Sequence, residues 1–294
     1  MAEPLPFRSS MTFAYGEPRE LSPGVARIVA NNPNHFTFKG TNTYLVGTRT
    51  LALIDPGPED PDHLAAILKA IGGRPISHVL ITHTHRDHTD GMPALLAATG
   101  ARTVGFGRRA PNRGTRRTSP SGGEFVDQDF VPDIPLADDG RIEGDGWAFA
   151  AVHTPGHARG HLCFYDEEMG FLLTSDNVVG AGTVVIAPPE GDMTDYLNSL
   201  ERMKNLPDLR HLCGSHGAAV FDARNKIEEY IAHRLEREKQ ILEAIETGAK
   251  SAEEIARIVY QNLNPPLFPL AVKSVEAHLA KIEKDRASKL CETP

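Results

Sequence analysis

The chain has few cysteines and no long apolar run, and these absences exclude several classes of protein. Cys163, Cys213 and Cys291 are too few for a disulfide framework, and their spacing is not that of zinc ligands. No apolar stretch approaches the roughly 20 residues that a membrane-spanning helix needs. Residues 1–20 lack the apolar segment of a secretory signal. We therefore expect a cytoplasmic protein with no membrane partner.

Positive charge is also scarce. Among 294 residues, 31 are Lys or Arg and 39 are Asp or Glu, which gives a net charge of −8. This balance disfavours a protein that is held on nucleic acid mainly by bulk electrostatics. Hydrophobic residues make up 40% and charged residues 24%. That composition is typical of a globular protein and excludes collagen-like and wholly disordered chains.

Histidine, in contrast, is concentrated in two short segments. Three of the 13 histidines lie within residues 83–88, and three more lie within residues 153–161. Neutral imidazoles beside carboxylates are the ligands that a divalent cation such as zinc prefers. The two segments therefore predict a metal site.

The order of the predicted elements indicates a layered α/β domain over residues 1–222. A helix is expected at 61–71, with Asp60 as its N-cap and Gly72 at its end, and another at 93–98. The first histidine segment directly follows an apolar strand, as is common for sites at the carboxyl ends of strands. The expected strands are 43–46, 51–54, 77–81, 147–152, 161–165, 171–173, 184–186 and 210–213, with a helix at 193–203.

Residues 223–294 have a different pattern, which predicts a small helical module. Apolar residues recur at helical spacing, and Ser251 with Glu254 forms a capping-box pattern. From residue 222 onward there are twelve Lys or Arg and thirteen Asp or Glu. Because a nucleic-acid reader is normally basic, we expect this module to be a scaffold, a homodimer contact or a pocket wall.

The segment from Thr82 to His88 is too short for all its polar side chains to bind one ion. We expect its donors to divide into two pairs, His83 with His85 and Asp87 with His88. Each pair needs further ligands for a tetrahedral site. Three later residues close strands at Gly or Ser turns and can supply them, namely His157, Asp176 and His216.

This pattern resembles the metallo-β-lactamase superfamily. The resemblance implies an α+β fold, a four-layer αββα sandwich, followed by a winged-helix-like module. It implies that His83, His85 and His157 hold one metal ion, that Asp87, His88 and His216 hold a second, and that Asp176 bridges them. Asp55, in the segment Leu53–Gly57, resembles the acid that braces the ligand loop, and we expect His161 to support the ligands from behind.

A closer similarity is to the beta-lactamase-like protein 2 group, whose members include a single-strand endoribonuclease and carry a C-terminal winged-helix module. The segment Phe38–Val46, Arg86 and the C-terminal helices carry this similarity. The chain departs from the family pattern beside two expected ligands. Asn177 follows Asp176 where a histidine is usual, and Gly214 and Ser215 precede His216 where Pro and Gly are usual.

The resemblance implies a hydrolase with two zinc ions per chain, with manganese or iron as alternatives. Two such ions lower the pKa of a bridging water, so that hydroxide is available near neutral pH. Asp87 is the residue that we expect to orient this water or carry its proton. No Ser or Cys nucleophile with a matching base was found in the sequence.

Two substrate classes remain after the other members of the family are considered. Only forty positions separate Asp176 from His216, which excludes nucleases with a large domain inserted there. The intact first histidine segment argues against diiron redox chemistry, and structural zinc sites are closed, which disfavours a non-catalytic zinc-binding protein. We expect a small ester, thioester or lactone as substrate, with a β-lactam as a side substrate, ahead of single-stranded RNA. Arg113, Arg116 and Arg117 would grip RNA phosphates if RNA is the substrate, but a solvated loop is the simpler interpretation.

Overall fold

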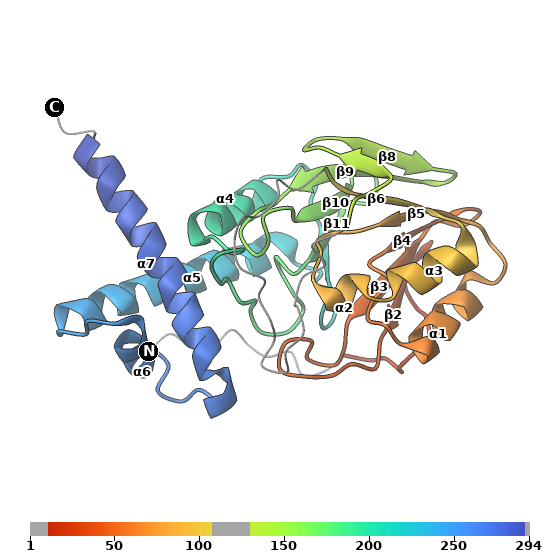
Figure 1. Cartoon of the computed structure of the whole chain (residues 1–294). Helices are drawn as coiled ribbons and strands as arrows, with labels where there is room; N and C mark the ends of the chain where they lie inside the picture. The colour runs from red at the N-terminus through yellow and green to blue at the C-terminus, as the bar shows by residue number, and fades with distance from the viewer. Residues whose placement is uncertain (1–10, 108–129, 292–294) are drawn as a thin grey trace.

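The computed structural model describes residues 11–107 and 130–291, and two β-sheets form its centre (Figure 1). Strands in the first sheet are antiparallel up to β4 and parallel beyond it. This sheet has the order β1 (Arg19–Ser22), β2 (Val25–Val29), β3 (Asn42–Val46), β4 (Leu51–Ile54), β5 (Ile76–Leu80), β6 (Arg102–Phe106) and β7 (Ile134–Leu136).

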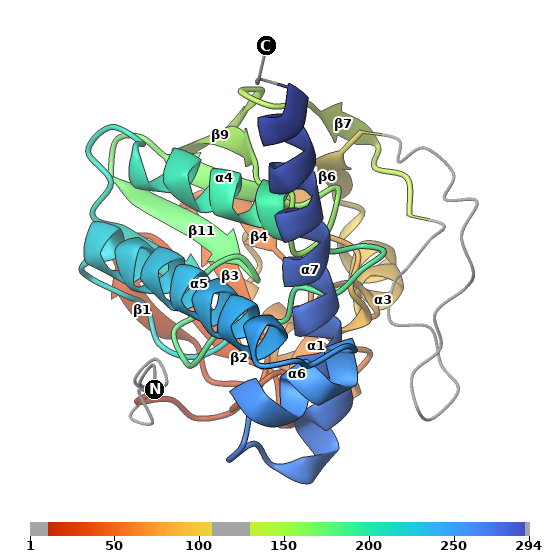
Figure 2. The same cartoon turned by 90° about the vertical axis from the view of Figure 1, so that its left-hand side faces the viewer.

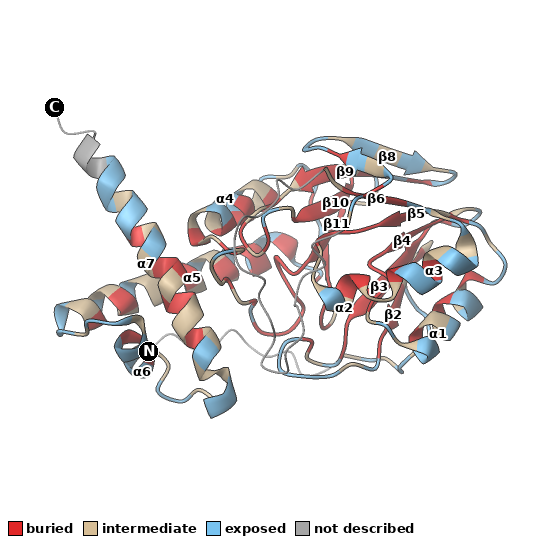
Figure 3. Ribbon diagram, viewed as in Figure 1, coloured by how far each residue is buried: buried red, intermediate tan, exposed pale blue. Residues whose placement is uncertain are grey.

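The second sheet contains five strands, of which only β11 and β12 pair in parallel. Its order is β12 (His211–Gly214), β11 (Phe171–Ser175), β10 (Leu162–Asp166), β9 (Trp147–His153) and β8 (Arg141–Gly144). Phe149, Phe164 and Phe171 from this sheet pack against Tyr44 and Ile54 from the first. The two sheets therefore bury a common apolar layer, which Figure 3 shows in red.

Helices cover the outer face of each sheet (Figures 1 and 2). On the first sheet, Ile67 of α1 (Pro61–Ile71) and Leu95 of α3 (Met92–Thr99) join the strands in one buried cluster. On the second, α4 (Met193–Lys204) and α5 (Ala223–Glu246) do the same through residues such as Leu200 and Ile227. The predicted four-layer αββα sandwich is confirmed.

Local sequence signals predicted some elements well and others badly. Helix α1 has the predicted bounds, with Asp60 accepting a hydrogen bond from the Asp62 amide and Gly72 in the left-handed region at φ +60°. The predicted strand at 184–186 is wrong, because those residues lie in no strand and the carbonyls of Val184 and Val185 bond to side chains instead. The prediction also missed β1 and β2, which precede the strand expected to open the fold.

The C-terminal helices form a second, smaller apolar core. Helices α6 (Ala252–Val259) and α7 (Phe268–Cys291), with the short 3-10 helix η1 (Pro265–Leu267), pack on the last part of α5 through residues such as Ile255 and Val275. The first part of α5 belongs to the main core. Helix α5 therefore joins both cores, and the boundary between residues 222 and 223 stays a prediction.

Ser251 caps α6 and accepts a hydrogen bond from the amide of Glu254, as the capping-box pattern predicts. The Glu254 carboxylate accepts a hydrogen bond from the amide of Lys250 rather than from that of Ser251.

The described ranges of the chain hold no helix that combines the length and the apolar character needed to cross a membrane. Cys163 and Cys213 are buried and free.

Candidate metal centre

The seven predicted donors come together at one edge of the sandwich. His83 and His85 follow β5, and the next two donors, Asp87 and His88, lie on the short helix α2 (Arg86–Thr89). The other three are contributed by the loops after β9, β11 and β12, which place His157, Asp176 and His216. Strand ends from both sheets thus converge on the same place.

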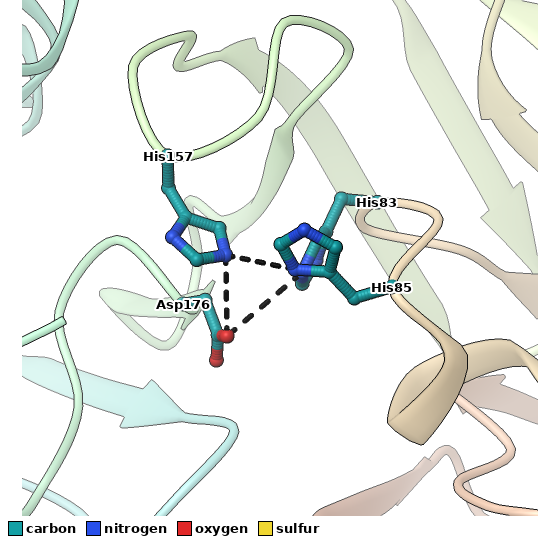
Figure 4. Close-up of side chains that lie close together, drawn as sticks. All are labelled: His83, His85, His157 and Asp176. Carbon is teal, nitrogen blue, oxygen red and sulfur yellow. Dashed lines mark hydrogen bonds and ion pairs between the residues drawn. The ribbon is translucent and has the colours of Figure 1, made fainter. Parts of the chain in front are cut away.

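Four of these residues form what we call the first donor set, shown in Figure 4: His83, His85, His157 and Asp176. The Nδ1 atom of His85 lies 2.9 Å from Nε2 of His83 and 3.0 Å from Nε2 of His157. Asp176 Oδ2 lies 3.4 Å from Nε2 of His157 and 3.9 Å from that of His83. Three ring nitrogens and one carboxylate oxygen therefore face a common point.

The second donor set consists of Asp87, His88 and His216. Asp87 Oδ2 lies 3.4 Å from Nε2 of His88 and 3.6 Å from Nε2 of His216. The remaining oxygen of Asp176, Oδ1, lies 3.7 Å and 3.3 Å from these two ring nitrogens. Asp176 thus presents one oxygen to each set.

The donors fit divalent cations by their chemistry as well as by their spacing. Tetrahedral ligands at 2.0–2.1 Å from zinc lie about 3.3 Å from one another, and the distances in both sets are close to that value. The Nδ1 atom of His157 donates to the carbonyl of Val185 at 3.0 Å. Its Nε2 therefore carries a lone pair and faces His85 Nδ1, an arrangement that a cation between them stabilises.

Hydrogen bonds to the outer ring nitrogens hold three of the other imidazoles in place. His83 Nδ1 lies 3.1 Å from Thr82 Oγ1, His88 Nδ1 lies 2.9 Å from Asp55 Oδ2, and His216 Nδ1 lies 3.3 Å from the Gly40 carbonyl oxygen. Partners of this kind fix the tautomer and the orientation of a metal-binding histidine. The inner nitrogen of each ring is left to face the donor set.

Asp55 occupies the place that the sequence predicts for the brace of the ligand loop. It directly follows β4 and has φ +51°, a strained value for a residue with a side chain. Its carboxylate accepts hydrogen bonds from the amide of Thr82 at 2.9 Å, from Thr82 Oγ1 at 2.7 Å and from His88. One buried acid therefore ties the start of the ligand loop to its end.

His161 lies behind the first donor set and belongs to neither set. Its ring centre is 5.0 Å from that of His83, and its side chain is fully buried. Its Nδ1 accepts a hydrogen bond from Asn177 Nδ2 at 3.1 Å, and this amide also donates to the Thr154 carbonyl at 2.8 Å. Asn177, which departs from the family pattern, thus supports His161.

Burial and mutual charge shift the pKa values of these groups. Burial lowers the pKa of His83 and His157, and it lowers that of His85 to about 3. Burial opposes ionisation of Asp176, yet the neighbouring imidazoles of His216 and His88 hold its pKa well below the usual range. The pKa of His88 shifts the other way: burial opposes its charged form, but Asp87 and Asp176 raise the pKa well above its usual value. The first donor set thus has the states that metal binding requires, which are neutral imidazoles beside an ionised carboxylate.

Several supporting residues were not singled out by the sequence. Asn42 Nδ2 donates to the carbonyls of Gly214 at 2.9 Å and Gly217 at 3.0 Å, and the Tyr44 hydroxyl donates to that of Gly214 at 2.6 Å. These bonds hold the loop that carries His216. Both residues lie in the Phe38–Val46 segment, whose resemblance to the family was the available signal. The predicted Arg113, Arg116 and Arg117 lie outside the described residues.

Comparison with known proteins agrees with this geometry. Residues 36–216 match the Metallo-beta-lactamase superfamily, and residues 251–287 match the Beta-lactamase associated winged helix domain. The chain belongs to the metallo-β-lactamase superfamily and is a hydrolase of that family. The fold therefore implies divalent metal ions, for which the two donor sets supply ligands.

Among individual relatives, the chain is 34% identical to the Beta-lactamase-like protein 2 homolog of Drosophila melanogaster, over 90% of this chain and 89% of that protein. It is 36% identical to an Atrochrysone carboxyl ACP thioesterase of Aspergillus chevalieri, over 91% of this chain and 83% of the relative. A beta-lactamase domain protein from Burkholderia ambifaria has the same fold, with a TM-score of 0.76, 21% identity, and coverage of 93% and 90% of the two chains.

Proposed function

We propose that this chain is a binuclear zinc hydrolase that cleaves small esters, thioesters or lactones. The position of Asp176 carries the proposal, because its two oxygens face different donor sets. A single tetrahedral ion would use only four of the seven donors and would leave buried histidines without a partner. Two ions that shared Asp176 would use all seven.

Zinc is the metal that the donor types favour, since both sets combine imidazole nitrogens with carboxylate oxygens. Manganese and iron are the alternatives that metal analysis would distinguish. When bound, such ions act as Lewis acids and lower the pKa of water, so that hydroxide is available near neutral pH.

Asp87 is the residue that we assign to the attacking water. Its side chain is 29% exposed, whereas that of its neighbour His88 is fully buried, so Asp87 is accessible to solvent. Thr41 Oγ1 donates to its Oδ2 at 3.1 Å and fixes the orientation of the carboxylate. Burial disfavours its charged form, but the adjacent His88 and then His216 hold its pKa low. An ionised Asp87 accepts a hydrogen bond from water and orients it.

The substrate class rests on relatives and on charge. The relative from Aspergillus chevalieri is named as a thioesterase. The acidic balance of residues 222–294 supports a small substrate over a polyanion, and it leaves a scaffold or homodimer contact as the proposed role of the module. Single-stranded RNA is the alternative, favoured by the match of residues 251–287 to a winged-helix domain.

A hydrolysis screen tests this proposal. Zinc-loaded protein would be assayed with acyl thioesters, aryl esters, lactones, nitrocefin and single-stranded RNA, and Asp176→Ala would be the matched control. We expect turnover of a thioester, ester or lactone that the variant lacks. Salt-sensitive cleavage of RNA with no turnover of the small substrates would overturn the substrate assignment.

A further inference from the structure

A segment without regular structure lies against the metal centre. Residues 182–187 lie in no helix or strand, although their β-branched residues favour a strand. Two consecutive carbonyls of this segment accept hydrogen bonds from side chains instead. Val184 accepts from Arg234 at 2.6 Å, and Val185 accepts from His157 at 3.0 Å. The segment therefore connects a buried arginine to a residue of the first donor set.

Arg234 reaches this segment from α5. Only 3% of the residue is exposed, and its guanidinium lies 5.3 Å from the ring centre of Tyr196. One of its terminal nitrogens donates to the Val184 carbonyl and, at 2.7 Å, to Thr183 Oγ1. Both acceptors are neutral, so these bonds offset the cost of burying the charge by orienting dipoles of the segment.

The carbonyl of Val185 determines which nitrogen of His157 carries the proton. A carbonyl only accepts, so Nδ1 of His157 is the protonated nitrogen and Nε2 is free to face the first donor set. Because the two valines are consecutive, fixing the carbonyl of Val184 restrains that of Val185. A change at Arg234 would release this restraint without touching the donor set.

Two further contacts tie the same region to the C-terminal helices. The Tyr230 hydroxyl of α5 donates to the Gly182 carbonyl at 2.8 Å. Lys284 of α7 pairs with Asp192 at 2.5 Å, and the amide of Asp192 donates to the carbonyl of Gly156, beside His157. Helices α5 and α7 thus hold both residues 182–187 and the loop that carries His157.

We propose that Arg234 is a positioning residue for the first donor set, acting through Val184, Val185 and the ring of His157. The inference rests on the proposed metal-binding function of that set. It gives the C-terminal helices a part in building the metal centre, because α5 supplies the Arg234 guanidinium, which helps to fix the orientation of His157. Nucleic acid is not needed to explain their presence.

Metal affinity of the full-length apoprotein tests this role directly. Zinc or cobalt(II) would be titrated into wild type, Arg234→Met and the control Arg237→Met, in competition with a chromophoric chelator. Arg237 lies one turn further along α5, where it donates to the Val259 carbonyl and lies 4.7 Å from the ring centre of Tyr260. Loss of a partner bonded directly to a metal ligand weakens metal binding by about 10–100-fold. Arg234 acts one step further out, so we expect a loss of about 10-fold or less for one metal equivalent in Arg234→Met and wild-type affinity in Arg237→Met.

A double-mutant cycle separates positioning from general destabilisation. In a His157→Ala background, Arg234→Met should leave the affinity for the remaining metal equivalent unchanged, because its effect passes through His157, whereas general destabilisation would lower that affinity as well. Arg234→Lys keeps one donor near the Val184 carbonyl, so it should restore part of the affinity, and it carries the test if the methionine variant does not fold.

Three outcomes would contradict the account. Wild-type metal affinity in both Arg234 variants would overturn the role of Arg234, as would an equal loss of affinity for the remaining metal equivalent in the His157→Ala background. A wild-type protein that binds no metal would instead overturn the proposed function on which the inference rests.

Discussion

The two donor sets differ in composition and in the groups that brace them. The first set combines three imidazoles with one carboxylate oxygen, and the second combines two imidazoles with oxygens from Asp87 and Asp176. The outer nitrogens of His83 and His157 bond to a hydroxyl and a carbonyl, whereas that of His88 bonds to the Asp55 carboxylate. The second set is therefore the more negative, and we expect it to hold its ion more by charge.

The sets also depend on different ends of the chain. Helix α5 supports the first set through residues 182–187, and β3 supports the second by holding the loop that carries His216. Asp176 alone contributes an oxygen to both. The centre is thus two separately supported halves joined by one carboxylate, and variants in each half should have separable effects.

The largest effect is expected from Asp176→Ala, which acts on both halves at once. Metal ions supply several kcal/mol of transition-state stabilisation, which corresponds to a rate loss of at least about a thousandfold. The variant should lose hydrolysis of the best wild-type substrate to this extent while keeping its far-ultraviolet circular dichroism. Retention of more than a tenth of the wild-type activity would contradict the role of Asp176 as the residue that both donor sets share.

A smaller and more selective effect is expected from His157→Ala and His216→Ala. Each variant removes a donor from one set only, so each should retain one metal equivalent while activity falls more than about 100-fold. Inductively coupled plasma mass spectrometry of the dialysed proteins measures the metal content. Loss of both ions in both variants would show that the halves are not separable.

Asp55→Asn tests the brace of the second set. The amide keeps the shape of the carboxylate but removes its charge, and it leaves His88 with a weaker partner. We expect metal affinity to fall about 10-fold, at the lower end of the range for outer partners. Asp145→Asn is the matched control, since that residue pairs with Arg49 on the surface. Chelator competition measures the affinity. Equal metal affinity in the two variants would show that Asp55 does not support the second donor set.

The effect with the least bearing on metal binding concerns His63, which is linked to Asp55 through Thr43. Its Nε2 lies 2.9 Å from Thr43 Oγ1, and that hydroxyl donates to the Asp55 carbonyl at 2.7 Å. Burial lowers the pKa of His63 to about 4. The unfolded chain, with a pKa near 6.5, therefore takes up this proton first, and stability falls as the pH drops from about 6.5 towards 4.

His63→Gln should remove that part of the pH dependence. The glutamine can keep a hydrogen bond to Thr43 but does not titrate. Between pH 7 and pH 5, urea unfolding of the apoprotein should lose on the order of 1–2 kcal/mol less stability in the variant than in wild type. Identical pH dependence of the two proteins would show that His63 is not held neutral.

The sequence predicted the donor residues more fully than their supports. Every donor is a His or Asp that follows an apolar strand, so type and position together pointed to a shared edge. Asn42 and Tyr44, in contrast, are ordinary residues of a buried strand. Their function arises from contacts with residues about 170 positions away, which no local pattern contains.

The same limit explains the wrong strand at 184–186. Val184, Val185 and Ile186 have the β-branched side chains that favour strands. The carbonyls of Val184 and Val185 instead accept hydrogen bonds from Arg234 and His157, both distant in sequence. Helix α1 was predicted at its observed bounds because its cap, its proline and its terminal glycine are all local. Local signals thus defined elements, and tertiary contacts defined the centre.

Metal stoichiometry tests the central claim most directly. The full chain would be loaded with excess zinc, freed of loosely bound ions and weighed intact by native mass spectrometry, with Asp176→Ala beside it. The account predicts two zinc ions per wild-type chain and fewer in the variant. A fully active wild-type protein with a single zinc ion per chain would contradict the account.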